Sequence, residues 1–228
     1  MGVLAFGDSI TNGGGELQWG VALQSWAQWV ARALGLPLTN CATDGARVDD
    51  VVGEQIPAFE RRTAKPGLRY DLGCLYVGVN DVRSTDWDAA TFEQSYRHAL
   101  AYLAGRCDRA LTATAPLDLG RPRAGAKVRE LNAAVERAAA DVGALVVDLS
   151  AFRARNHVMA DRVHPTAFGQ IAIAERALDV LAGDGRPPVV RPSTLIVYET
   201  TRWKRLRGDA TYVYRYAKNG LRAAIMRL

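Results

Sequence analysis

VLAFGDSITNGGG, residues 3–15, is the stretch that decides the fold. Its first four residues are apolar, and a run of this length is typical of a buried strand. The run leads directly into Gly7, Asp8 and Ser9, and glycines and short polar residues follow, which indicates a loop. The stretch therefore predicts a buried strand that ends in a polar loop carrying a serine. We expect Asp8 to hold this loop through backbone hydrogen bonds.

The pattern of an apolar run followed by a polar turn or helix recurs along the chain. Further strands are expected at 36–41, 72–79, 109–115 and 144–148, and helices at 19–34, from about 48, and at 88–104, 125–141 and 164–181. Alternating strands and helices predict a flavodoxin-like α/β/α sandwich with a five-stranded parallel sheet. Since ligands bind such sheets outside the carboxyl ends of the strands, Ser9, Gly45 and Asn80 should gather on one rim.

Composition limits the class of protein. The 228 residues are 49% apolar and 23% charged, as in an ordinary soluble globular chain. The N-terminus lacks a secretion signal and no apolar run approaches membrane-spanning length, so a cytoplasmic location is expected.

Cys41, Cys74 and Cys107 are interpreted as small buried apolar residues. The chain also lacks phosphate-binding and dinucleotide-binding glycine motifs, and we expect neither a metal nor a cofactor.

The basic character of the chain is concentrated in its tail. Residues 184–228 hold ten Lys or Arg against three Asp or Glu, a net +7, whereas the whole chain carries +5. We therefore divide the chain into a catalytic domain, 1–183, and a basic aromatic extension, 184–228. Strands are expected at 195–198 and 211–216 and a basic helix at 218–228.

Two interpretations of this extension are open. Its aromatic residues could pack on the core, with the charges facing water. Alternatively it docks an anionic partner such as an acyl carrier protein, a phospholipid surface or an acidic glycan. Nucleic acid is not expected because the tail has no base-reading motif.

A serine hydroxyl needs a base within hydrogen-bond reach, and the chain has only three histidines. His98 falls in the middle of a predicted helix, and His157 has no carboxylate shortly before it. His164 lies at a loop-to-helix junction, three residues after Asp161, where a carboxylate can fold back onto the imidazole. Taken alone, Asp161 and His164 could equally be a pair that caps the start of a helix.

Four sequence blocks in order resolve this ambiguity. They are LAFGDSITNG at 4–13, NCATDG at 40–45, GVND at 78–81 and DRVHP at 161–165. With these blocks the chain resembles the SGNH hydrolases, also called the GDSL esterase/lipase family. One departure is visible, because Ala42 stands where many relatives have the first glycine of the second block.

The resemblance implies a role for each block. Ser9 would be the nucleophile, His164 the general base and Asp161 the residue that orients it. The oxyanion hole would consist of the N–H groups of Ser9 and Gly45 and the side-chain amide of Asn80. Gly45 and Asn80 could otherwise be simple turn residues.

The substrate is not determined by these motifs. A small-molecule carboxylic ester is expected, such as an acyl lipid or an acylated carbohydrate. An esterase and an acyltransferase would share every catalytic residue, and an inactive binding module is a third possibility. Trp19, Arg47, Arg83 and Trp87 follow the rim motifs closely and are candidates to line the pocket. Arg162, like Arg83, is a candidate to engage an anionic or sugar-bearing substrate.

Overall fold

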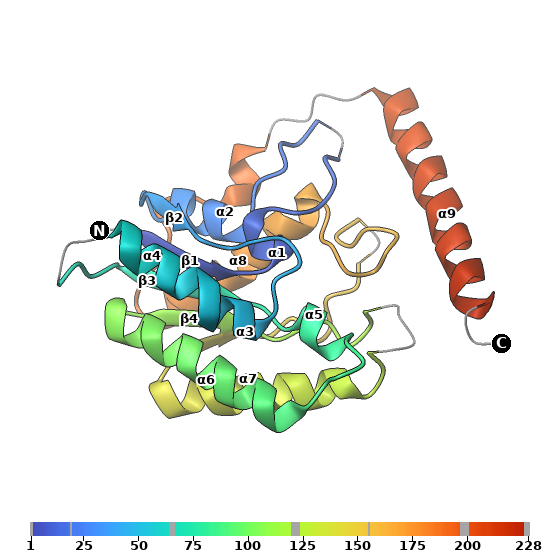
Figure 1. Cartoon of the computed structure of the whole chain (residues 1–228). Coiled ribbons are helices and arrows are strands. Elements are labelled where there is room, and N and C mark those ends of the chain that lie inside the picture. The colour runs from blue at the N-terminus through green and yellow to red at the C-terminus, as the bar shows by residue number, and fades with distance from the viewer. Residues whose placement is uncertain are drawn as a thin grey trace.

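A computed structural model describes residues 2–18, 20–63, 67–119, 124–154, 156–196 and 201–225. Five parallel strands form one sheet in the order β2-β1-β3-β4-β5 (Figure 1). The strands are β1 (Val3–Gly7), β2 (Leu38–Asn40), β3 (Leu72–Tyr76), β4 (Ala110–Ala113) and β5 (Leu145–Val147). This order is the flavodoxin-like one, so the predicted fold class is confirmed.

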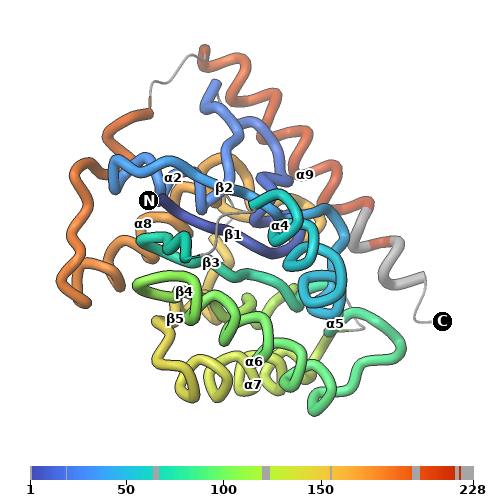
Figure 2. Tube along the Cα trace, turned by 60° about the vertical axis from the view of Figure 1, so that its left-hand side comes forward, coloured from blue at the N-terminus to red at the C-terminus, as the bar shows by residue number. Residues whose placement is uncertain are grey.

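Helices cover both faces of the sheet and give three layers (Figures 1 and 2). They are α1 (Ser9–Asn12), α2 (Trp26–Ala33), α3 (Val48–Asp50), π-helical η1 (Val51–Gln55), α4 (Ile56–Arg62), α5 (Val79–Val82), α6 (Ala89–Arg106), α7 (Lys127–Val142), α8 (Ala167–Gly183), 3₁₀-helical η2 (Pro192–Leu195) and α9 (Arg202–Ile225). Helices α2 and α8 pack together on one face, and α6 and α7 pack together on the other. No helix among the described residues is long and apolar enough to cross a bilayer.

The centre of the sheet is entirely apolar. Every residue of β1 and β3 is buried, as expected for parallel strands covered on both faces. The two strands pair from Val3 with Leu72 to Gly7 with Tyr76, so both end at the same level. The segments that follow them, α1 and α5, therefore begin side by side at the rim.

Caps decide where the helices begin. The side chain of Asp88 accepts a hydrogen bond from the Thr91 N–H at 2.8 Å and begins α6 as predicted. Helix α2 was expected from residue 19, but it begins at Trp26 because Ser25 caps it. Helix α8 was expected from residue 164, but its cap is Thr166. The 161–164 segment is consequently a loop.

The tail differs from its prediction. Residues 211–216 do not form a strand but belong to helix α9. The alternation in Tyr-Val-Tyr-Arg-Tyr suggests a strand, yet a helix satisfies its backbone hydrogen bonds without a neighbouring sheet edge. Leu195 lies in the 3₁₀ helix η2, and residues 197–198 of the other expected strand lie outside the described residues. The basic helix expected at 218–228 is the last part of α9, described as far as Ile225.

The first part of the tail is attached to the core. The Val189 N–H donates to the Ala33 carbonyl at 2.8 Å, and Arg191 forms ion pairs with Glu175 and Asp179 of α8. Residues 184–196 thus lie against α2 and α8, whereas α9 lies further from the sheet (Figure 1). The division of the chain at residue 184 stays a prediction.

Candidate active site

The turn after β1 places Ser9 at the rim of the sheet. β1 ends at Gly7, and Ser9 is the first residue of α1. Asp8 between them is buried and accepts a hydrogen bond from the Ile10 N–H at 2.9 Å, which caps the helix. The expected backbone-holding role of Asp8 is confirmed. The serine side chain is half-buried and projects from a fixed backbone.

Glycines make room for this turn. A Cβ on Gly7 would lie 2.3 Å from the carbonyl oxygen of Tyr76, and Gly7 has a φ of 152°. A Cβ on Gly14 would lie 2.7 Å from the carbonyl oxygen of Ser9. A side chain at either position would displace the segment that carries Ser9.

A continuous chain of hydrogen bonds joins Ser9, His164 and Asp161. Ser9 Oγ lies 3.0 Å from His164 Nε2, and His164 Nδ1 lies 2.7 Å from Asp161 Oδ2. The other carboxylate oxygen, Oδ1, accepts hydrogen bonds from the backbone N–H groups of Val163 and His164 at 2.9 and 3.0 Å. Asp161 therefore fixes both the imidazole and the loop that carries it. The structure brings the three residues together as expected.

The hydrogen bond between Asp161 and His164 makes the imidazole more basic. The hydrogen bond from Nδ1 to Asp161 raises the pKa of His164 above its ordinary value, although partial burial opposes the shift. Burial alone would raise the pKa of Asp161, but hydrogen bonds from His164 and from the Val163 and His164 N–H groups outweigh it and lower that pKa. Asp161 is thus ionised at neutral pH and holds the ring with Nδ1 protonated. The Nε2 atom is left as the acceptor that faces Ser9.

Gly45 and Asn80 lie on the segments next to Ser9. Gly45 occupies an exposed turn with a φ of 78°, and the Asn12 amide of α1 donates to Asp44 of this turn at 2.9 Å. Asn80 is half-buried in α5, and its amide donates to the Ala46 carbonyl at 3.0 Å. An amide group has two hydrogens, so one remains for a further acceptor. Turn and amide are therefore fixed relative to each other.

Two glutamines that sequence patterns did not reveal brace the Ser9 turn. Gln55 accepts from the Gly7 N–H at 3.1 Å and donates to the Gly7 carbonyl at 2.8 Å. Gln170 donates to the carbonyls of Ile10 and Gly14 at 3.0 and 3.1 Å. Both side chains are buried. Gln170 is a polar residue within the apolar run of α8 and could have been noticed, but Gln55 carries no such signal.

Two buried carboxyl groups lie under the rim. Burial raises the pKa of Asp8 to about 7, although the Ile10 hydrogen bond and the charge of His164 oppose it. Burial likewise raises the pKa of Asp81 to about 6, and Asp81 accepts from the Val48 N–H at 3.1 Å. Both groups therefore titrate near neutral pH.

The residues predicted to line a pocket lie in different surroundings. Arg47 is paired with Asp86 at 3.0 Å, and Trp87 packs on Phe92 with ring centroids 5.2 Å apart. Arg83, half-buried at the end of α5, is close enough to His164 for its charge to act on the imidazole. Trp19 lies outside the described residues. A part in substrate binding stays a prediction for all four positions.

Arg162 and His157, which were also candidates, contact other side chains of the protein. Arg162 contacts Asp118 at 3.4 Å and Tyr216 of α9. His157 is stacked on Phe152, with ring centroids 5.5 Å apart, and His98 is exposed on α6. Among the described histidines, only His164 has Ser9 as a hydrogen-bond partner.

Comparisons with known proteins agree with the fold. The fold is similar to LAE5, an alpha/beta hydrolase enzyme from the metagenome of Lake Arreo, Spain (21% identity, 79% of this chain and 94% of that chain, TM-score 0.60). It is also similar to Axe2, an acetylxylan esterase from Geobacillus stearothermophilus (20% identity, 78% of this chain and 93% of that chain, TM-score 0.59). No curated protein sequence matches the chain. The sequence profile of GDSL-like lipases and acylhydrolases matches residues 5–171, so the chain belongs to the GDSL-like lipase/acylhydrolase family.

Proposed function

We propose that the protein is a serine esterase that hydrolyses carboxylic esters through an acyl-enzyme on Ser9. The observation that carries the proposal is the hydrogen-bonded chain from Ser9 through His164 to Asp161, with distances of 3.0 and 2.7 Å. A nucleophile, a base and a residue that orients the base are the parts that acyl transfer by serine requires. Membership of an acylhydrolase family supports the same reaction class.

In the proposed cycle each proton has a defined donor and acceptor. Ser9 Oγ attacks the ester carbonyl carbon while His164 Nε2 accepts the hydroxyl proton. The imidazolium so formed is stabilised by Asp161 and then protonates the departing alcohol oxygen, which leaves an acyl group on Ser9. A water molecule attacks this acyl group, and His164 first accepts a proton from water and then returns one to Ser9.

The oxyanion formed in each half of the cycle needs hydrogen-bond donors. We assign this role to the N–H groups of Ser9 and Gly45 and to the free hydrogen of the Asn80 amide. The Asn80 hydrogen bond to Ala46 supports the assignment, because it holds the amide in place before charge develops. Neutral donors of this kind stabilise a localised negative charge without requiring solvent to reorganise.

The acyl and alcohol parts of the preferred ester can be identified by measuring hydrolysis of a series of substrates. The protein should release p-nitrophenol from esters between acetate and decanoate, and the preferred chain length reports the size of the acyl site. Acetylated xylooligosaccharides belong in the series because Axe2 is an acetylxylan esterase. Added glycerol or sugars that accelerate p-nitrophenol release and become acylated would identify an acyltransferase. Failure to hydrolyse any ester, with no acyl adduct on Ser9 by mass spectrometry, would contradict the proposal.

The Asn80→Ala variant should lower kcat for the preferred ester by about 10²- to 10³-fold, because one oxyanion donor is lost. The value of KM should change little, since the donor acts mainly on the transition state. Steady-state kinetics on the purified variant measure both constants.

The isosteric Asn80→Asp variant serves as a matched comparison. It keeps the shape of the side chain but places a carboxylate beside the developing oxyanion, so its kcat should fall at least as far. A kcat within about threefold of the original for both variants would exclude Asn80 as a donor, since a typical donor is worth far more.

The pH profile of kcat/KM should rise as His164 loses its proton, because only neutral His164 can accept the Ser9 proton. The midpoint should lie above the ordinary histidine value of about 6.5, since the hydrogen bond to Asp161 raises the pKa of His164. Activity is thus lost as the pH falls through that pKa. Initial rates at low substrate concentration between about pH 5 and 9 give the profile. A profile with its midpoint below the ordinary value would contradict the hydrogen-bonded arrangement.

A further inference from the structure

Helix α9 lies beside the loops that surround the candidate active site (Figures 1 and 2). Its inner side makes polar contacts with them. Arg215 forms an ion pair with Glu16 at 3.1 Å. The Tyr216 hydroxyl accepts a hydrogen bond from the Arg162 guanidinium, which also lies 4.7 Å above the centre of the Tyr216 ring. The helix is therefore held at the rim through charged and polar groups.

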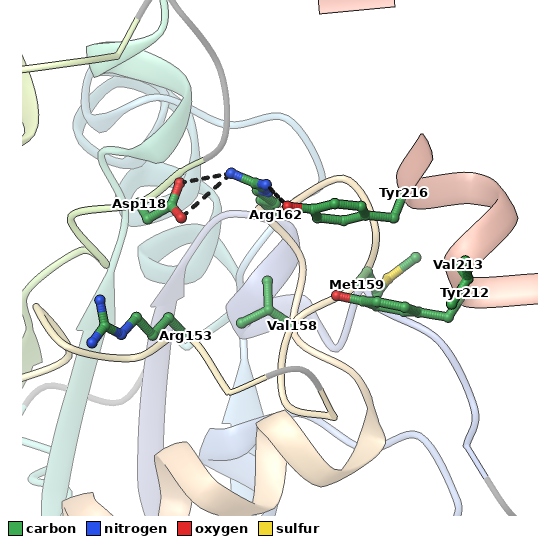
Figure 3. A pocket seen from close by; sticks show the side chains of 8 residues that line it. All are labelled: Asp118, Arg153, Val158, Met159, Arg162, Tyr212, Val213 and Tyr216. Atoms are coloured by element: carbon green, nitrogen blue, oxygen red, sulfur yellow. Dashed lines mark hydrogen bonds and ion pairs between the residues drawn. The ribbon is translucent and has the colours of Figure 1, made fainter. Parts of the chain in front are cut away.

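The inner side of α9 does not pack tightly on the core. Cavities of about 400 and 330 Å³ lie between the helix and the rim loops. Figure 3 shows the larger cavity, with Tyr212 and Tyr216 of α9 on one side and Arg162 and Asp118 on the other. An amphipathic helix normally buries its apolar face against the core, and α9 does not.

A second set of apolar residues of α9 faces solvent instead of the cavity. Trp203, Leu206, Tyr214 and Leu221 recur at helical spacing and, with Ala210 and Ala217 between them, form one face of the helix. We call these six residues the apolar stripe. Trp203 is 81% exposed, Tyr214 66% and Leu221 65%. A continuous exposed stripe of large apolar side chains indicates an interaction surface.

Cations border this stripe. Arg207 and Lys218 follow Trp203 and Tyr214 by four residues, which places each cation beside an aromatic residue of the stripe. Arg202 precedes Leu206 by four residues and therefore lies beside it in the same way. Between residues 202 and 221 the helix holds six Lys or Arg and a single acidic residue, Asp209. The partner of this surface must therefore combine an apolar interior with negative charge.

We propose that α9 docks the protein on the surface of an anionic phospholipid bilayer, with the apolar stripe inserted among the acyl chains near the headgroups. A helix with aromatic and leucine residues on one face and basic residues beside them is the type that lies in the plane of a membrane interface. Tryptophan and tyrosine favour that boundary, and lysine and arginine reach from it to lipid phosphates. A second copy of the chain fits less well, because two basic helices would repel each other.

Docking in this way would bring the rim of the sheet to the membrane. The inner side of α9 faces the loops that contain Arg162 and Glu16, and the Arg162 loop carries His164. Ester groups of lipids or of membrane-bound glycans would then be presented on the side of the molecule where Ser9 lies. The binding measurement itself does not depend on catalysis, so it stands or falls separately from the proposed esterase activity.

Co-sedimentation of the full-length protein with vesicles tests the proposal. Vesicles of phosphatidylglycerol and phosphatidylcholine should pellet the protein, whereas pure phosphatidylcholine vesicles should bind it at least tenfold more weakly. Raising the salt concentration should release the protein, because screening weakens the attraction between exposed charges and the surface. The Trp203→Glu/Leu221→Glu double variant should lose binding by tenfold or more. The Arg207→Gln/Lys218→Gln double variant should bind anionic vesicles on the order of tenfold more weakly.

A Val189→Glu variant is the matched control, because Val189 is an apolar residue of the core side that is 83% exposed. It should bind like the original protein, and circular dichroism should show all variants folded. The proposal is overturned by an absence of binding to anionic vesicles, by equal binding of both vesicle types, or by unchanged binding of the Trp203→Glu/Leu221→Glu variant. Stripe-dependent dimers in sedimentation velocity, or capture of an acyl carrier protein without vesicle binding, would also overturn it, since the surface would then have another partner.

Discussion

The Ser9→Ala variant should hydrolyse p-nitrophenyl acetate more slowly than the original protein by a factor on the order of 10⁴ to 10⁶. Removal of Oγ leaves the proton acceptor, His164 Nε2, in place but removes the nucleophile, so the acyl-enzyme cannot form. The oxyanion donors and the binding site persist, and they account for the residual rate. The fold should be unaffected because the backbone bonds of the turn, such as Gly14 N–H to the Ser9 carbonyl at 2.6 Å, do not involve the hydroxyl.

Stopped-flow release of p-nitrophenol and mass spectrometry of quenched samples measure this effect. The original protein should carry the acyl group on the peptide that contains Ser9, and the variant should carry none. Ser95→Ala is a suitable control. It also removes a serine hydroxyl, but that hydroxyl lies on α6 and donates to Asp49 of α3. If Ser9→Ala kept a tenth of the activity, another residue would have to be the nucleophile.

The Asp161→Asn variant should lower kcat by about 10⁴-fold near neutral pH, as expected when the residue that orients a catalytic histidine is neutralised. An asparagine amide would donate to His164 Nδ1, so the ring proton would shift to Nε2. That atom could then no longer accept the proton of Ser9. The remaining carbonyl oxygen can still bind the Val163 and His164 N–H groups, so the loop should keep its shape.

An Asp118→Asn variant is the control for Asp161→Asn, because it neutralises another carboxylate on the same side of the molecule. Asp118 contacts Arg162 rather than His164, so this substitution should leave kcat within a few fold. Thermal unfolding of both variants separates a loss of stability from a loss of catalysis. Near-normal kcat for Asp161→Asn would show that Asp161 only holds the 161–164 loop through the Val163 and His164 N–H groups.

Much of the fold could be predicted because its strands are buried on both faces. Apolar runs such as 72–79 identify a parallel strand without information from the rest of the chain. Helix starts were less predictable. Ser25 and Thr166 both accept a hydrogen bond from the third backbone N–H that follows, which helical periodicity alone does not reveal. In α9, the spacing of aromatic residues suits both a strand and a helix. The segment is helical because none of the described strands lies beside it as a partner.

The candidate site was predictable to the extent that its residues sit in local motifs. Ser9, Asp161 and His164 lie in the short sequence blocks that carry the resemblance to the SGNH hydrolases. Gln55 and Gln170 act instead on backbone groups that are distant in sequence. Gln55 bonds both backbone groups of Gly7, as a neighbouring strand would. A single side chain in this role leaves no periodic pattern in the sequence. Likewise, Arg47 forms an ion pair with Asp86 and Trp87 packs on Phe92, and neither contact could be predicted from the sequence around Arg47 or Trp87.

The separation of 155 residues between Ser9 and His164 has a consequence for biosynthesis. Ser9 leaves the ribosome first, and at about 5–20 residues per second its base follows about 8–30 s later. During that time the hydroxyl is an ordinary, unreactive alcohol, because no imidazole is near it. The brace from Gln170 arrives with α8, later still than the loop of His164. On the proposed mechanism, a nascent chain or one truncated before His164 would therefore not capture an acyl group, and Ser9 would become a nucleophile only after the sheet is complete.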